Sequence, residues 1–164
     1  PHETTLASLK PLVPVFLSYI LSFAYVGIYW NNHHHMFHAV SKVSGGVMWL
    51  NLLLLFCLSL FPFATAWVGE SEFSKWPTIL YGIVLLLAGT AYYFLSLCLI
   101  SIHGKDSTLA KAVGKDTKGI ISVMVYLIGI ALSFISPVAG FIAYAVVACI
   151  WFIPDRRIEK RMKD

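Results

Sequence analysis

Five apolar stretches, each free of Asp, Glu, Lys and Arg, dominate the chain. They run approximately over Pro11–Phe37, Val47–Val68, Pro77–Ile102, Gly119–Ile135 and Val138–Ile153. A helix that spans a bilayer needs about 20 apolar residues, with a range of roughly 17–25, so each stretch is a candidate span. The pattern predicts an all-α, polytopic membrane helix bundle with five transmembrane helices, in a single membrane domain over residues 1–164.

The connections between the stretches refine this prediction. Ser136 and Pro137 separate the last two stretches, which are shorter than the others. Because the residue before a proline disfavours the helical conformation, the two stretches are expected to form a tight helical hairpin. The polar segment over residues 103–118 is predicted to hold a short helix around Leu109–Val113.

Positive charge is distributed unevenly between the two sides of the predicted bundle. Lys42 follows the first stretch, four lysines follow the third, and a basic tail occupies residues 154–164; the other side has only Lys10 and Lys75. Cytoplasmic loops carry the excess of Lys and Arg, which predicts a multi-pass membrane protein with a cytoplasmic C-terminus. The N-terminus then falls outside the cell without an export signal, so we expect a further membrane helix before Pro1.

Composition limits the classes of function. Hydrophobic residues make up 59% of the chain and charged residues 12%, whereas a soluble domain has roughly 25% charged residues. No basic stretch alternates with aromatic residues in a hydrophilic segment, so no nucleic-acid partner is expected. Cys57, Cys98 and Cys149 form no C-x-x-C pair and are predicted to be small buried side chains.

The densest polar cluster lies at the end of the first stretch, where it comprises Trp30, Asn31, Asn32, His33, His34, His35 and His38. On a helix His34 and His38 share a face, and imidazoles at that spacing can bind a transition metal. However, there is a single such box, and no acidic residue lies in a membrane segment to complete a site. We favour an interhelical hydrogen-bonded network, because polar groups in a bilayer need partners, with pH sensing as a narrower alternative.

Two stripes of small and hydroxyl residues recur at helical spacing. The first consists of Ser18, Ser22, Tyr25, Tyr29 and Asn32, and the second of Ser122, Tyr126, Gly129 and Ser133. Such stripes are typical of helix–helix packing in membranes. The alternative is that the polar face made by Ser18, Ser22, Tyr25 and Tyr29 lines an aqueous path.

One run within the first stretch is distinctive: Phe16-Leu17-Ser18-Tyr19, Ser22-Phe23, and Val26-Gly27-Ile28-Tyr29-Trp30-Asn31-Asn32-His33-His34. It closely resembles the second helix of bacterial relatives of transmembrane protein 175, the lysosomal potassium channel family. The Trp-Asn-Asn-His-His core is the specific part of this resemblance. The later stretches and the basic tail agree with that family across essentially all 164 residues as a pattern.

The resemblance implies six helices per repeat, a homotetramer, and a pore lined by the first helix, where bulky apolar side chains form the constriction. In the family that first helix carries an Arg-x-x-x-Phe-Ser-Asp motif, which is linked to polar residues of the second helix. Here all arginines lie in the tail, and the chain resembles the family from its second helix onward. The network residues carried over are Trp30, Asn31, Asn32, His33 and His34, and the constriction is not among these residues.

The sequence therefore predicts a potassium channel subunit that conducts potassium passively, as the scaffold around a pore lined by the missing first helix. It is not expected to be an enzyme, and it needs no catalytic residue, metal or cofactor, with potassium as the permeant ion. Its expected partners are the lipid bilayer, identical subunits in a homotetramer, and the missing helix of the same protein. The alternatives are a His-dependent metal-binding or metal-transporting membrane protein, and a membrane scaffold without transport activity.

Overall fold

The computed structural model describes residues 6–113 and 116–152, and every regular element in these ranges is a helix. A short 3-10 helix, η1 (Leu6–Leu12), leads into the bundle. The α-helices are α1 (Val13–His38), α2 (Gly45–Glu70), α3 (Lys75–His103), α4 (Thr108–Val113), α5 (Thr117–Ser133) and α6 (Pro137–Phe152). The predicted all-α membrane bundle is confirmed, and α4 lies where the short helix was expected.

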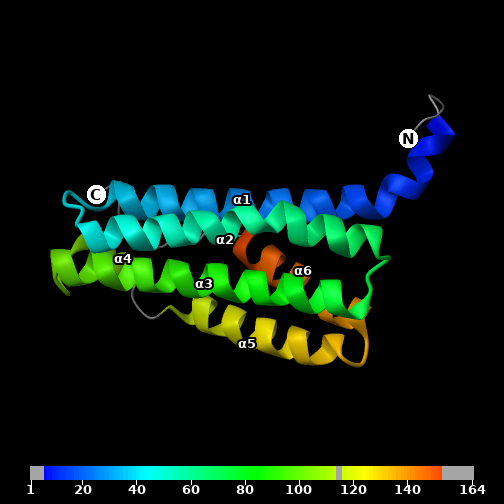
Figure 1. Cartoon of the computed structure of the whole chain (residues 1–164). Helices are drawn as coiled ribbons and strands as arrows, with labels where there is room; N and C mark the ends of the chain where they lie inside the picture. The colour runs from blue at the N-terminus through cyan, green and yellow to red at the C-terminus, as the bar shows by residue number, and fades with distance from the viewer. Residues whose placement is uncertain (1–5, 114–115, 153–164) are drawn as a thin grey trace.

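The three long helices run side by side as an up-and-down layer, and the α5–α6 hairpin packs against this layer (Figure 1). Helix α2 contacts both α1 and α3, while α3 contacts α5 and α6, and α6 also reaches α1. The loops at residues 39–44 and 104–107 lie at one end of the bundle. The loops at 71–74 and 134–136 lie at the other end, next to η1 (Figure 1).

Helix length separates the long layer from the hairpin. Helices α1, α2 and α3 contain 26, 26 and 29 residues and are apolar and long enough to cross a membrane. Helices α5 and α6 are also apolar but contain 17 and 16 residues in the described part of the chain. The two sequence stretches that were expected to be short are therefore the two short helices of the structure.

Local chemistry explains where several helices begin and end. The Ser44 hydroxyl accepts a hydrogen bond from the Val47 amide at the start of α2, and the Asp116 carboxylate accepts one from the Gly119 amide at the start of α5. These bonds satisfy amides that have no partner within the helix. Helix α3 ends at Gly104, whose φ of +85° is open mainly to glycine.

The centre of the bundle is aromatic and closely packed. Tyr25, Phe61 and Tyr81 form edge-to-face pairs with ring centroids 6.0–6.5 Å apart. Tyr144 of α6 lies in a slot between two glycines: a Cβ added at Gly82 would stand 2.6 Å from its Cζ, and one added at Gly129 would stand 2.5 Å from its Cε1. We call this arrangement the Tyr144 slot. It requires glycine on both α3 and α5, because any side chain there would occupy the space of the ring.

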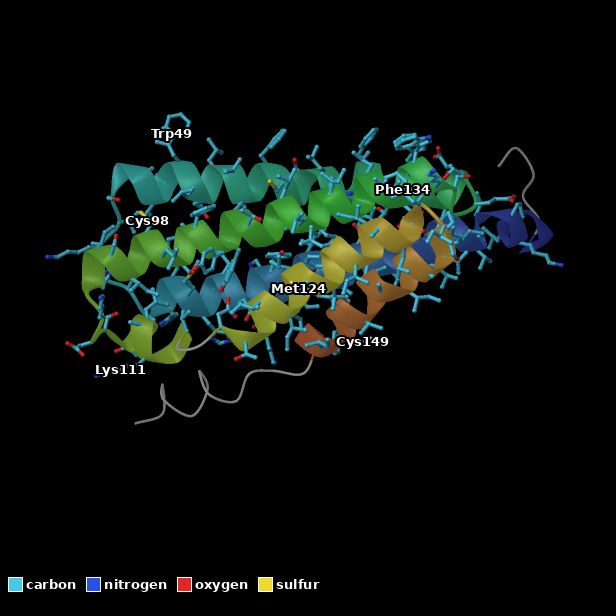
Figure 2. All side chains as sticks on the ribbon, turned by 90° about the horizontal axis from the view of Figure 1, so that it is seen from below. Trp49, Cys98, Lys111, Met124, Phe134 and Cys149 are labelled. Atoms are coloured by element: carbon cyan, nitrogen blue, oxygen red, sulfur yellow. The ribbon has the colours of Figure 1, made fainter. Side chains whose placement is uncertain are left out.

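The outer surface is as apolar as the core. Large hydrophobic side chains project outward from the long helices and the hairpin; Trp49 and Phe134, which Figure 2 labels, are 73% and 52% exposed. Water would solvate such a surface poorly, whereas lipid chains are a suitable solvent for it. The chain is thus a multi-pass membrane protein. The prediction that all three cysteines are buried is wrong, because Cys98 is only half-buried and Cys149 points outward from α6, where a small apolar thiol is compatible with lipid.

Candidate functional site

The polar cluster at the end of α1 contributes one hydrogen bond between helices. His33 Nε2 lies 2.6 Å from Oδ1 of Asn51 on α2, and both residues are half-buried. Because an amide oxygen only accepts, Nε2 of His33 carries the proton and donates it. The His33 ring also packs on Phe37, with centroids 4.5 Å apart. This bond ties α1 to α2 about one and a half turns from the loop that joins them.

Other members of the cluster face away from the bundle. Trp30 is 65% exposed and stacks on His34, with ring centroids 5.5 Å apart and planes 13° from parallel. His34 in turn contacts His38 at 5.5 Å, and both are exposed. Asn32 is half-buried and donates to the carbonyl of Ile28 on its own helix at 2.8 Å. The cluster therefore divides between an inward His33 and an outward group.

The outward group continues a longer exposed face of α1. We define the outer α1 stripe as the exposed residues that recur every three or four positions along this helix: Phe16, Ile20, Phe23, Gly27, Trp30, Asn31, His34 and His38. The stripe is apolar over its first half and polar or aromatic over its second half. No described helix covers it, although Asn31 and His34 are groups that need hydrogen-bond partners within a bilayer.

The serine and tyrosine stripe of α1 faces the opposite way. Ser18, Ser22 and Tyr25 are buried, and the Tyr25 hydroxyl donates to the carbonyl of Tyr144 on α6. Within the described residues, the Ser22 hydroxyl has no hydrogen-bond partner. Tyr29 is half-buried and packs edge-on against Phe61. This face of α1 therefore makes contacts between helices.

The second stripe lies on the buried side of α5. All four of its members, Ser122, Tyr126, Gly129 and Ser133, are buried. The Ser122 hydroxyl donates to the carbonyl of Lys118 at 2.8 Å and accepts a hydrogen bond from Trp151 Nε1 at 2.7 Å. Ser133 donates to the Gly129 carbonyl at 2.7 Å. The stripe thus packs α5 against α3 and α6 and joins α5 to the end of α6.

Two residues near the 39–44 and 104–107 loops make contacts between elements that the sequence did not predict. Asn51 is the sole amide side chain in its apolar stretch, and that isolation was the available signal. His103 is the second: its Nε2 accepts from the backbone amides of Ser41 and Lys42 at 3.2 Å each, while Nδ1 donates to the Leu99 carbonyl at 2.9 Å. His103 thereby fastens the α1–α2 loop to the end of α3.

The alternative of a metal centre finds no site in the described residues. Within them, no group of three His, Cys, Asp or Glu side chains lies close enough to hold a metal ion. His34 stacks on Trp30 and meets His38 and His35 edge-to-face, with ring centroids 5.5 and 6.0 Å apart. The expectation that the cluster binds no metal stays a prediction, and elemental analysis of the purified protein would test it.

The His33–Asn51 bond makes a measurable prediction. Replacing either residue with alanine is expected to destabilise the protein, and a double-mutant cycle should give a coupling of about 1 kcal/mol, as for other polar contacts between membrane helices. Chemical unfolding in mild detergent measures this coupling. Ser59→Ala is the matched control, because Ser59 is an exposed polar residue of α2 whose described hydrogen bond stays within its own helix, so its loss should leave the stability nearly unchanged. Purely additive effects of the two substitutions would contradict the interhelical bond.

The chain is similar along its whole length to a protein named as a potassium channel. A sequence model of the family described as endosomal/lysosomal potassium channel TMEM175 matches residues 1–62, a range that includes α1 and most of α2. A potassium channel of Chryseobacterium sp. (strain P1-3) is 49% identical over 164 residues, which is 100% of this chain and 85% of the relative. No solved structure matches significantly.

Two more distant relatives match the N-terminal part. A potassium channel of Streptomyces collinus is 40% identical over 57 residues, covering 35% of this chain and 28% of the relative. A potassium channel of Chamaesiphon minutus is 36% identical over 64 residues, covering 39% and 32%. Together with the full-length similarity to the Chryseobacterium protein, these matches agree with the resemblance carried by the Trp-Asn-Asn-His-His core. The chain belongs to the TMEM175 potassium channel family.

Proposed function

We propose that this chain is a subunit of a channel that conducts potassium passively across a bacterial membrane. The observation that carries the proposal is the 49% identity, over the whole chain, to a bacterial protein named as a potassium channel. The architecture supports it, since an apolar helical bundle suits a channel subunit in lipid. The proposal assigns the chain no catalytic reaction and no cofactor.

The proposal extends to assembly. We propose that the conduction path lies at the centre of a homotetramer and not within this single bundle. The outer α1 stripe supports this assignment, because its second half presents Trp30, Asn31 and His34 to the outside. We propose that the stripe packs against a pore-lining helix of the same protein. Asn31 and His34 would then find partners on that helix, which removes the cost of leaving polar groups unpaired in lipid.

The proposal also includes an orientation. The end of the bundle with the 39–44 and 104–107 loops would face the cytoplasm, together with the basic tail, because the adjoining segments hold Lys42, Lys105, Lys111 and Lys118. In a bacterium this membrane would be the inner membrane. Single cysteines introduced at Lys105 and Glu72 should react with a membrane-impermeant reagent from opposite sides, and reaction of both from the same side would contradict the orientation.

Ion flux tests the function directly. The full-length protein, reconstituted in liposomes loaded with potassium, is expected to release potassium down its gradient when a protonophore balances the charge. The controls are protein-free liposomes loaded with potassium and protein-containing liposomes loaded with sodium. A potassium release rate equal to that of the protein-free liposomes would overturn the proposed function.

A substitution in the outer α1 stripe tests the proposed assembly separately from the channel function. Asn31→Leu is expected to reduce the flux or the fraction of tetramer, because it removes a polar group from the outer α1 stripe. Ser59→Leu is the matched control: Ser59 is exposed on α2, and its hydroxyl bonds only to the Phe56 carbonyl of its own helix at 2.7 Å among the contacts described. Unaltered flux and assembly in Asn31→Leu would contradict the role of the stripe while leaving the channel function standing.

A further inference from the structure

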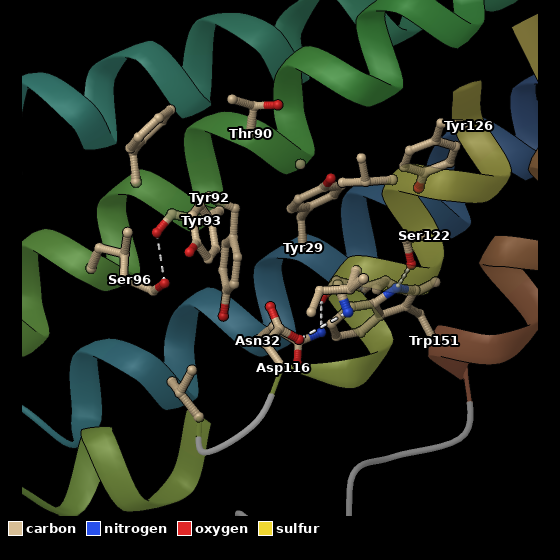
Figure 3. Close-up of a pocket in the computed structure, with 18 of the residues that line it drawn as sticks. Tyr29, Asn32, Thr90, Tyr92, Tyr93, Ser96, Asp116, Ser122, Tyr126 and Trp151 are labelled. Carbon is tan, nitrogen blue, oxygen red and sulfur yellow. Dashed lines mark hydrogen bonds between the residues drawn. The ribbon is translucent and has the colours of Figure 1, made fainter.

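A cavity of about 500 Å³ lies among α1, α3 and α5 (Figure 3). Its size falls within the range of roughly 300–1,000 Å³ that is typical of sites for small organic molecules. Several of its lining residues, including Tyr93, Phe94 and Leu97 on α3 and Ile120 on α5, are 42–67% exposed. The cavity therefore opens on the outer surface of the bundle, between α3 and α5.

Several polar atoms of the cavity wall are acceptors, beside tyrosine hydroxyls that can both donate and accept. The hydroxyls of Thr90 and Ser96 donate their protons to carbonyls of their own helix, at 2.8 Å each. The Ser122 hydroxyl likewise donates to the Lys118 carbonyl, and the Asn32 amide nitrogen donates to the Ile28 carbonyl. The three hydroxyls therefore present lone pairs to the cavity, while the Asn32 amide offers its acceptor oxygen and a second N–H.

An acidic group adds a negative charge to this wall. Asp116 lines the cavity, and Figure 3 shows it in the same part of the cavity as Asn32 and Tyr92. One carboxylate oxygen, Oδ1, accepts the Gly119 amide at 2.9 Å, which leaves Oδ2 as a further acceptor. The Oδ1 of Asn32 is an acceptor as well. A carboxylate and an amide oxygen in partly apolar surroundings are complementary to a cation that donates several hydrogen bonds.

The remainder of the wall is apolar and aromatic. Ile28, Leu97, Ile100 and Met124 offer contacts to a hydrocarbon body, and the rings of Tyr29 and Tyr92 can face a cation. The protein itself contains an example of a cation beside an aromatic ring in this region, since Lys118 Nζ lies 5.9 Å from the centre of the Trp151 ring. An anionic ligand would be repelled by the Asp116 carboxylate, and a plain hydrocarbon chain would make no hydrogen bond with it.

We propose that this cavity binds a small hydrophobic amine, whose ammonium group is held by Asp116 and Asn32 and whose apolar body lies between α3 and α5. The site is independent of the conduction path proposed above, so it is tested by binding and not by flux. The probe is 1-aminoadamantane, a rigid cationic amine of suitable size. Its neutral and anionic counterparts are 1-adamantanol and adamantane-1-carboxylate.

Binding of the radiolabelled amine to the full-length protein in lipid nanodiscs, with empty nanodiscs as the blank, is the measurement. We expect saturable binding near one amine per chain, displacement by the alcohol at least about tenfold more weakly, and no displacement by the carboxylate, in line with the strength of charge-assisted hydrogen bonds. Absence of saturable binding, or equal displacement by the alcohol, would overturn the proposal.

Two variants locate the site. Asp116→Asn removes the charge but keeps an N-cap for α5, so the preference for the amine over the alcohol should disappear while the helix stays formed. Gly89→Leu should abolish binding by filling the cavity: a Cβ at Gly89 meets its nearest atom, the Tyr29 hydroxyl, at an ordinary 3.5 Å. Ala131→Leu, an exposed change on α5, is the control and should bind normally. Full amine preference in Asp116→Asn, or normal binding in Gly89→Leu, would contradict the site.

Discussion

Replacing Tyr144 with alanine is expected to lower the free energy of unfolding by about 3–5 kcal/mol, the usual loss when a large buried aromatic side chain is removed. The ring fills the Tyr144 slot between Gly82 and Gly129 and is fully buried. It also makes ring contacts with Tyr81 and Tyr126, at centroid distances of 5.8 and 6.4 Å. Without it, α3, α5 and α6 would surround an empty space that the two glycines cannot fill.

Tyr144→Phe is the matched control for this prediction. It retains the ring and removes a hydroxyl whose described partner is Ser133, at 3.5 Å, the long limit for a hydrogen bond. Its expected cost is below about 1 kcal/mol, since a hydrogen bond this long contributes little. Thermal unfolding of both variants in the same detergent measures the difference. Equal losses in the two variants would mean that the hydroxyl, and not the filling of the slot, carries the stability.

Gly69→Leu is expected to have the second largest effect, a destabilisation of about 3 kcal/mol, at the upper end of typical overpacking costs. A Cβ at Gly69 would stand 2.7 Å from the Cα of Val15, so the side chain would collide with the backbone of α1 and not with a side chain that can rotate. The crossing of α1 and α2 near η1 would have to open. Such close approaches of helix backbones in membranes depend on small residues.

Gly45→Leu separates this steric effect from a change in helix propensity. Gly45 also belongs to α2, at its first turn, and a Cβ there has nothing within 4 Å. Leucine favours the helix over glycine by up to roughly 1 kcal/mol, so this variant should be neutral or slightly more stable in detergent. Chemical unfolding of the two glycine variants makes the comparison, and a similar destabilisation of both would contradict the packing explanation.

The helices could be predicted closely because lipid imposes a simple rule on the sequence. Charged residues are confined to the ends of the apolar stretches, so their absence marks each span, and Ser136-Pro137 marks the turn of the hairpin. The arrangement of the helices could not be predicted in this way. The Tyr144 slot depends on two glycines that are 47 residues apart in sequence and meet on either side of one ring.

The polar cluster was harder to interpret, for a geometric reason. Residues 30–34 cover more than a full turn of helix, so a consecutive run of polar residues must point in every direction. The sequence therefore identified the group but not which member faces inward. His33 faces Asn51, while Trp30 and His34 face outward. A lone amide in an apolar span is a sign of such a partner, and the same test applied to Asn51 would have suggested the pair.

Because α5 is much shorter than α3, the apolar thickness of the bundle differs between its two sides, and this affects the surrounding lipid. Seventeen residues of helix measure only about 25 Å, less than the roughly 30 Å of an average hydrocarbon core. Either the bilayer thins beside α5 or the charged start of that helix is drawn below the headgroups, at a cost of fractions of a kcal/mol per ångström of hydrophobic mismatch. The neighbouring α3, with 29 residues, has no such deficit. Bilayer thickness should thus act unequally on the two sides of the protein, and lipids with shorter acyl chains should collect next to the hairpin.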